Sequence, residues 1–119
     1  MTRIAPTVAQ LEREIDVQAD VVRAYEAVGC RVVSFSQGRR TRQTVGIPDL
    51  KIYCARLRLT WWMEVKAGDG KQRSAQRAFQ AMVETCGETY VLGGLDAALV
   101  QLRRLGLVAA PLKDRRPRG

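Results

Sequence analysis

The stretch from Gly46 to Lys66 decides the fold and reads GIPDLKIYCARLRLTWWMEVK. Within it, residues 50–55 and 60–65 form two short apolar segments that are rich in aromatic and β-branched residues, as β-strands are. The four residues between them are too few for a parallel crossover connection. The pattern therefore predicts an antiparallel hairpin.

Two registers are open for this hairpin. A turn centred on Leu57 and the residue before it places Asp49 opposite Glu64. A turn centred on Leu57 and the residue after it places Asp49 opposite Lys66 instead. Directly opposed side chains have Cβ atoms about 4.5–5.5 Å apart, and residues two apart on a strand share one face. In either register two carboxylates and an amine meet at one place, which is the outline of a metal-dependent hydrolytic site.

The residue types suit a divalent cation and a phosphate. Mg²⁺ takes oxygen ligands, usually from one or two carboxylates together with water and substrate phosphate. Asp49 and Glu64 would supply the carboxylates, and the backbone carbonyl of Val65 could add a neutral oxygen. Lys66 would orient or deprotonate the attacking water, or stabilise the charge of the transition state. The alternative is structural: Glu64 and Lys66 form a solvated pair on an edge strand, and Asp49 merely opens a strand.

Length and charge set the class of protein. At 119 residues the chain is long enough for one domain with a sizeable hydrophobic core, which we expect to span residues 1–119. Within it, residues 1–7 are predicted to form a frayed arm and residues 111–119 a disordered basic tail. The net charge of +8 favours a polyanionic partner, and sixteen of the twenty basic residues are Arg, which suits bidentate contacts to phosphate. The alternative is a basic protein without such a partner.

The sequence also excludes several kinds of site. It contains no histidine, so His-based triads, His-metal nucleases and the usual zinc sites are excluded or nearly so. Three widely spaced cysteines, Cys30, Cys54 and Cys86, lie in apolar surroundings, and we expect them to be reduced core residues. Because neither a signal-peptide pattern nor a long apolar run is present, we expect a cytoplasmic protein, in the host cytoplasm if it is viral.

A helix is predicted from Val8 to Val28, ended by Gly29. Two polar residues break its apolar stripe, because Glu14 lies at the margin and Gln18 lies within it. Either both form hydrogen bonds to the sheet, or Glu14 faces the metal site, as a third carboxylate or a holder of metal-bound water, with Gln18 in support. The predicted apolar stripe comprises Val8, Leu11, Ile15, Ala19 and Val22, flanked by Val21 and Tyr25.

The remaining segments continue an alternation of strands and helices. Trp61 and Trp62 point to opposite faces of their strand, so one should lie in the core and the other on the opposite sheet face or at an interface. Ser74 is a fair N-cap for a helix that buries Ala75, Phe79, Met82, Val83 and Cys86. The other predicted elements are a strand at 31–35, the helix at 74–86, a strand at 89–92 and a helix at 95–105.

Two basic loops flank the predicted metal site. The loop at 36–45 leads into the hairpin and carries Arg39, Arg40 and Arg42, and the loop at 67–73 carries Lys71 and Arg73. We expect these five side chains to contact DNA phosphates around the scissile bond. For the first loop the alternative is a charge-rich segment without a role.

Gln76 follows the second loop, in the first turn of the predicted helix. From there its amide could reach the carboxylates or a phosphate. The alternative is an ordinary exposed helix residue.

Taken together, these residues resemble the VRR-NUC domain of the PD-(D/E)xK nuclease superfamily. Glu-x-Lys is a weak signal by itself, whereas the full order of motifs is fairly specific. The likeness covers the chain from about residue 11 to residue 105. The matching positions are, in order, Glu14, Gln18, Gly46-Ile47-Pro48-Asp49, Glu64-Val65-Lys66 and Ser74-Ala75-Gln76.

The resemblance implies an α/β fold: an α/β/α restriction-endonuclease-like core, whose central mixed sheet of about four strands is flanked by helices. It also implies hydrolysis of phosphodiester bonds with Mg²⁺ or Mn²⁺. The family's roles fall on Asp49 and Glu64 as metal ligands and on Lys66 as the catalytic lysine, with Glu14 and Gln76 assisting.

Small stand-alone members of this family are similar to virus or phage proteins that act as homodimers on branched DNA such as four-way junctions. The expected function is therefore a metal-dependent, structure-selective DNA endonuclease, a homodimeric Holliday-junction resolvase. A nuclease directed at flaps or nicks is one alternative, and a DNA-binding module that has lost catalysis is another. The long Arg-rich loop before Gly46 departs from the family pattern and leaves the choice of substrate open.

Overall fold

The structure is a computed structural model that describes residues 8–35 and 44–109. The predicted frayed arm, the tail and the loop positions Arg39, Arg40 and Arg42 lie outside the described residues. No described helix is long and apolar enough to cross a membrane. The helices and strands are α1 (Val8–Ala27), β1 (Arg31–Ser34), β2 (Leu50–Cys54), β3 (Leu59–Val65), α2 (Ser74–Thr85), β4 (Tyr90–Gly93) and α3 (Leu95–Arg104).

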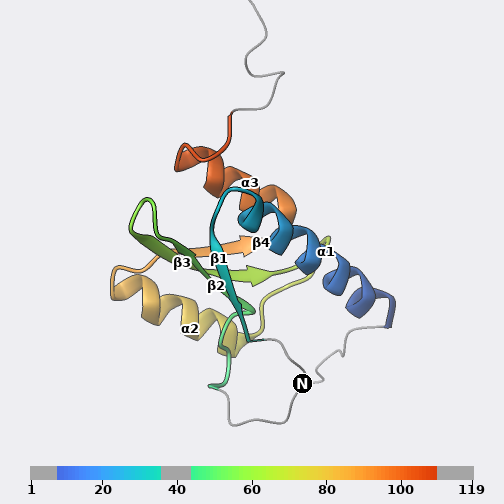
Figure 1. Ribbon diagram of the computed structural model, residues 1–119. Helices are drawn as coiled ribbons and strands as arrows, with labels where there is room; N and C mark the ends of the chain where they lie inside the picture. Colours follow the sequence, from blue (N-terminus) through green and yellow to red (C-terminus); the bar gives the residue numbers. More distant parts are fainter. Residues whose placement is uncertain (1–7, 36–43, 110–119) are drawn as a thin grey trace, which may run out of the picture.

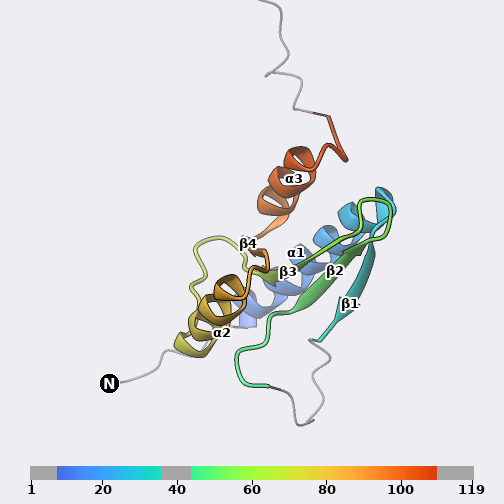
Figure 2. The same ribbon diagram turned by 90° about the vertical axis from the view of Figure 1, so that its left-hand side faces the viewer.

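The strands form one mixed sheet in the order β1-β2-β3-β4. The first three strands pair antiparallel, whereas β3 and β4 pair parallel. A parallel pair needs a crossover connection, and α2 provides it. In two views α2 lies on one side of the sheet, and α1 and α3 lie together on the other (Figure 1, Figure 2). This arrangement confirms the expected α/β/α architecture with a central mixed sheet.

The hairpin of β2 and β3 adopts the first of the two predicted registers. Leu50 pairs with Met63, and the ladder continues to Cys54 and Leu59. One step beyond the ladder, Asp49 therefore lies opposite Glu64. The turn at 55–58 closes with Arg58 at a positive φ of 59°.

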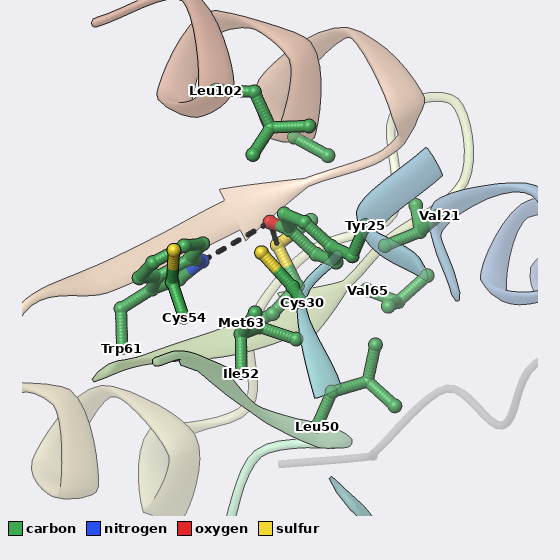
Figure 3. Close-up of a cluster of buried hydrophobic side chains, with 11 residues drawn as sticks. Val21, Tyr25, Cys30, Leu50, Ile52, Cys54, Trp61, Met63, Val65 and Leu102 are labelled. Atoms are coloured by element: carbon green, nitrogen blue, oxygen red, sulfur yellow. Dashed lines mark hydrogen bonds between the residues drawn. The ribbon is translucent and has the colours of Figure 1, made fainter. Parts of the chain in front are cut away.

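The core lies between the sheet and the α1/α3 layer. Every second residue of the two central strands points into it, including the fully buried Leu50, Ile52 and Met63. Tyr25 of α1 packs edge-on against Trp61, with 5.7 Å between ring centroids. Its hydroxyl lies between two side chains of β3, because it accepts from Trp61 Nε1 and donates to Met63 Sδ, each at 3.3 Å (Figure 3).

The opposite face of the sheet carries Trp62, as the predicted alternation requires. Its ring packs against Phe79 of α2 and Phe35, with centroid distances of 5.1 and 6.1 Å. The ammonium group of Lys51 lies 3.9 Å from the centre of the same ring, and the indole N–H donates to Glu88. The α2 side of the sheet is thus closed around Trp62 by aromatic and charged contacts.

The structure corrects the predicted stripe of α1. Ile15 is 68% exposed and Ala19 is also exposed, whereas Val21 and Tyr25 are fully buried. The helix is rotated because Tyr25 fills the space beside Trp61, so the predicted flank is the true buried face. Gln18, one turn before Val21, is half-buried on that side.

Two further predictions about burial are wrong. Cys30 and Cys54 are buried, but Cys86 is exposed at the end of α2. Met82 is 54% exposed, while Val83 is buried. Helix α2 covers only part of its sheet face, which leaves one side of its predicted apolar stripe in solvent.

Candidate active site

Asp49 is held by both neighbours of its strand. Its carbonyl oxygen accepts from the N–H of Phe35, and its Oδ2 accepts from the N–H of Val65, both at 2.8 Å. The preceding Pro48 is buried, and Ile47 N–H donates to Thr44 to close a turn. The carboxylate is therefore anchored at the end of the β2/β3 ladder.

The turn before Asp49 abuts the first turn of α2. Gly46 has a φ of +83°, which favours glycine. A Cβ at this position would clash with the Ala75 carbonyl group, since it would lie 2.6 Å from the carbonyl carbon and 3.1 Å from the Gln76 nitrogen. The absence of a side chain at Gly46 thus allows the two segments that carry Asp49 and Gln76 to touch.

Glu64 is 1% exposed and receives contacts from three sides. The amide nitrogen of Gln76 donates to its Oε2 at 2.6 Å, and Lys66 Nζ lies 3.4 Å from the same oxygen. The hydroxyl of Tyr90, on β4, donates to Oε1 at 3.5 Å. Both oxygens of this buried carboxylate therefore have donors, as a buried charge requires.

Gln76 is oriented by the start of its own helix. Its Oε1 accepts from the N–H of Arg73 at 2.8 Å, which leaves the amide nitrogen to face Glu64. Arg73, whose backbone is extended, is the N-cap residue, and the predicted N-cap Ser74 is instead the first residue of α2. The prediction that Gln76 reaches the carboxylates is confirmed in its placement.

Both acidic side chains are harder to ionise than usual. Burial raises the pKa of Glu64 to about 7; the nearby Asp49 carboxylate raises it too, and Lys66 opposes the shift. The pKa of Asp49 is also raised, mainly by burial, against the lowering effect of the Val65 N–H and Lys66. The two neighbouring carboxylates repel each other when both are ionised, and a cation between them would stabilise their ionised forms.

A cavity of about 230 Å³ opens at this end of the sheet. Seven of the predicted site residues line it: Glu14, Asp49, Glu64, Val65, Lys66, Arg73 and Gln76. Phe35, Ile47 and Pro48 complete the wall. Among the described residues that were predicted to act here, Gln18 and Lys71 do not line the cavity.

Glu14 reaches the cavity from α1. A Cβ atom added to Gly70 would lie 3.6 Å from Glu14 Oε2 and 3.7 Å from Lys66 Cδ. The Glu14 and Lys66 side chains therefore both approach Gly70. The charge of Glu14 contributes to the raised pKa of Asp49. Within residues 8–35 and 44–109, no group of three His, Cys, Asp or Glu side chains could hold a metal ion. Glu14 thus lines the same cavity as Asp49, and both roles considered for it stay predictions.

Sequence reasoning missed two residues behind the site. Tyr90 and Gln72 contact each other, and Tyr90 contacts Glu64. The register of the parallel pair places Tyr90 beside Trp62, on the face that also carries Glu64. Alternation along β4 shows which of its residues share a face. It could have placed Tyr90 on the face of Glu64 only if the parallel pairing of β3 and β4 had been known.

Comparison with known proteins agrees with this geometry. No protein-family model matches the sequence, and no curated protein matches it. A solved structure named "VRR_NUC domain" is similar to this chain, with a TM-score of 0.60 and 26% sequence identity. The similarity covers 77% of this chain and 95% of that one.

The similarity suggests a nuclease of the PD-(D/E)xK superfamily, a fold that generally uses divalent metal ions, and a nuclease domain implies DNA as a substrate. The mixed sheet, the order of the site residues along the chain and this structural match support the identification of the chain as a VRR-NUC domain protein.

Proposed function

We propose that this protein is a divalent-metal-dependent DNA endonuclease that hydrolyses phosphodiester bonds. The observation that carries the proposal is the convergence of Asp49, Glu64 and Lys66 in one cavity, with both carboxyl pKa values raised. A purely structural role would not require a buried and a half-buried acid to face a cavity together.

The residues present fit a hard divalent cation. Asp49 and Glu64 are oxygen donors, and Val65 lines the same cavity, where its carbonyl could add a neutral oxygen. Such a set, completed by water and substrate phosphate, is what Mg²⁺ and Mn²⁺ accept. When bound, the ion would supply Lewis-acid polarisation of the phosphoryl group.

The protein's own groups have distinct tasks in the proposed reaction. The Lys66 ammonium group, which also contacts Glu64, is placed to neutralise charge that develops on the phosphoryl oxygens or to orient the attacking water. Arg73 brings a guanidinium group to the cavity wall, where it suits a bidentate phosphate contact. Gln76 keeps the Glu64 carboxylate directed into the cavity.

We further propose that the substrate is branched DNA, with the four-way junction as first candidate, and that the protein acts as a homodimer. Support comes from the net charge of +8, together with the similarity to a VRR_NUC domain. Symmetric resolution of a junction needs two cleavage sites related by a two-fold axis, which a dimer of this chain would supply.

A cleavage assay on defined substrates tests the proposal. Labelled four-way junction, flap, nicked duplex and linear duplex are each incubated with Mg²⁺, Mn²⁺ or EDTA. We expect metal-dependent cleavage with preference for the junction. Preference for flaps or nicks would change the substrate, and binding without cleavage in any metal would indicate an inactive DNA-binding module. Equilibrium sedimentation of the same sample tests the dimer.

A further inference from the structure

A chain of hydrogen bonds lies behind Glu64, on the side away from the cavity. Tyr90 is 8% exposed and does not line the cavity, so it cannot touch a substrate there. Its hydroxyl donates to Glu64 Oε1, whereas Gln76 donates to Oε2. The Glu64 carboxylate is thus held from two elements, β4 and α2.

The chain continues through Gln72, the residue before the N-cap of α2. Its amide nitrogen donates to the Tyr90 oxygen at 3.2 Å and to Gln80 Oε1 at 3.0 Å. The amide nitrogen of Gln80 in turn donates to Glu84 Oε2 at 3.1 Å. Successive hydrogen bonds therefore connect Glu84, on the surface of α2, to Glu64 in the cavity.

The direction of these bonds is fixed by chemistry. A carboxylate oxygen can only accept, so Glu84 requires the amide nitrogen of Gln80 to face it. Gln80 then presents its oxygen to Gln72, whose amide nitrogen is left to donate to the Tyr90 oxygen. The ionised carboxylate of Glu64 can likewise only accept, so the Tyr90 hydroxyl donates its proton to Glu64.

We infer that Tyr90 is a positioning residue for Glu64, and that Gln72 sets the direction of the Tyr90 hydroxyl. This inference rests on the proposed metal-dependent function. Together with Gln76, the Tyr90 hydroxyl fixes the plane of the carboxylate before a cation arrives. Removing such outer partners of a metal ligand typically weakens metal binding about 10- to 100-fold.

The test measures Mn²⁺ binding without DNA, by the loss of the free-ion signal in electron paramagnetic resonance. Tyr90→Phe removes only the hydroxyl, and we expect about tenfold weaker Mn²⁺ binding. Gln72→Leu should weaken Mn²⁺ binding by a smaller factor. Because both act through one hydroxyl, Gln72→Leu should add nothing in the Tyr90→Phe background. Thermal unfolding should remain cooperative, and the Kd for uncleaved junction DNA in EDTA should stay close to that of the unchanged protein.

Tyr53→Phe is the matched control, because Tyr53 is a 46% exposed strand residue outside the cavity, and it should bind Mn²⁺ normally. Unchanged Mn²⁺ affinity in Tyr90→Phe, or fully additive losses in the double variant, would overturn the positioning role alone. If the unchanged protein binds no Mn²⁺, both the positioning role and the proposed metal dependence are overturned.

Discussion

Oδ2 of Asp49 accepts a hydrogen bond from the backbone N–H of Val65 at 2.8 Å. The acidic side chain therefore extends the β2/β3 ladder by one bond while it lines the cavity. Asp49 therefore has a structural role and a proposed catalytic role. Different substitutions of Asp49 can separate these two roles.

Asp49→Asn should keep the fold and abolish cleavage. An amide oxygen can still accept from Val65, so stability should change little, whereas the charged ligand is lost. DNA binding should survive or tighten, because a negative charge near phosphate is removed. Gel-based cleavage and fluorescence anisotropy measure the two effects. Asp96→Asn, the same change at an exposed position in the first turn of α3, is the control, and retained turnover in Asp49→Asn would remove the metal-site assignment.

Asp49→Ala, in contrast, should also destabilise the protein. It leaves the Val65 N–H without its partner, which costs about 1–3 kcal/mol where the group is buried. Urea unfolding compares the alanine and asparagine variants. Equal stability of the two would show that the side-chain bond to Val65 does not support the ladder.

The metal-free protein should lose stability as pH rises from about 4.5 to about 7. The folded state raises the pKa of Glu64 from 4.5 to about 7, so it binds a proton in that range that the unfolded state has released. The expected loss is up to about 3 kcal/mol, complete above the folded pKa, with Asp49 acting in the same direction. Unfolding in EDTA at pH 5 and pH 8 measures it, and Glu64→Gln should flatten the profile. An equal slope in Glu64→Gln would contradict the assignment.

Mg²⁺ or Mn²⁺ should reverse that loss at pH 8. A ligand at one hundred times its Kd stabilises the folded state by about 2.7 kcal/mol, because it binds only the folded site. Thermal unfolding with and without the ion should show a rise in Tm for the unchanged protein and little for Asp49→Asn or Glu64→Gln. A similar rise in all three proteins would place the ion elsewhere.

Replacing Arg39, Arg40 and Arg42 together with Gln should weaken DNA binding and flatten its salt dependence. For every phosphate that the variant no longer neutralises, the slope of log K against log salt should fall by about 0.9. The control replaces Arg103 and Arg104 in the last turn of α3, on the opposite side of the sheet from α2. A slope that stays the same in the triple variant would show that DNA binds elsewhere.

Gly46→Ala should lower the free energy of unfolding by more than the strain of a left-handed backbone alone would. Gly87→Ala is the matched control, because Gly87 has a similar φ of +88° but no atom within 4 Å of its Cβ position. That control should lose roughly 1–2 kcal/mol from the left-handed backbone. Gly46→Ala adds a clash with the Ala75 carbonyl, so it should lose more stability and also cleavage activity. Equal losses in the two variants would show that the contact with α2 is not tight.

The sequence allowed the hairpin and its candidate site to be predicted because they depend on local rules. Strand alternation and a short turn place Asp49 near Glu64 and limit the registers to two. The rotation of α1 could not be predicted, because it depends on the tertiary contact between Tyr25 and Trp61, which are far apart in the sequence. Tyr90 was missed for a similar reason, since its neighbours depend on a parallel pairing between distant segments.

The β2/β3 turn and the acidic pair lie at opposite ends of the same two strands. A five-residue strand such as β2 spans roughly 17 Å, so the exposed residues Ala55, Arg56 and Arg58 are far from the cavity. We expect this turn to accept a longer connection, a fluorophore or a surface tether while the ladder keeps the acids face to face. The hairpin thus offers an attachment point from which the protein can be immobilised or labelled with the cavity left open.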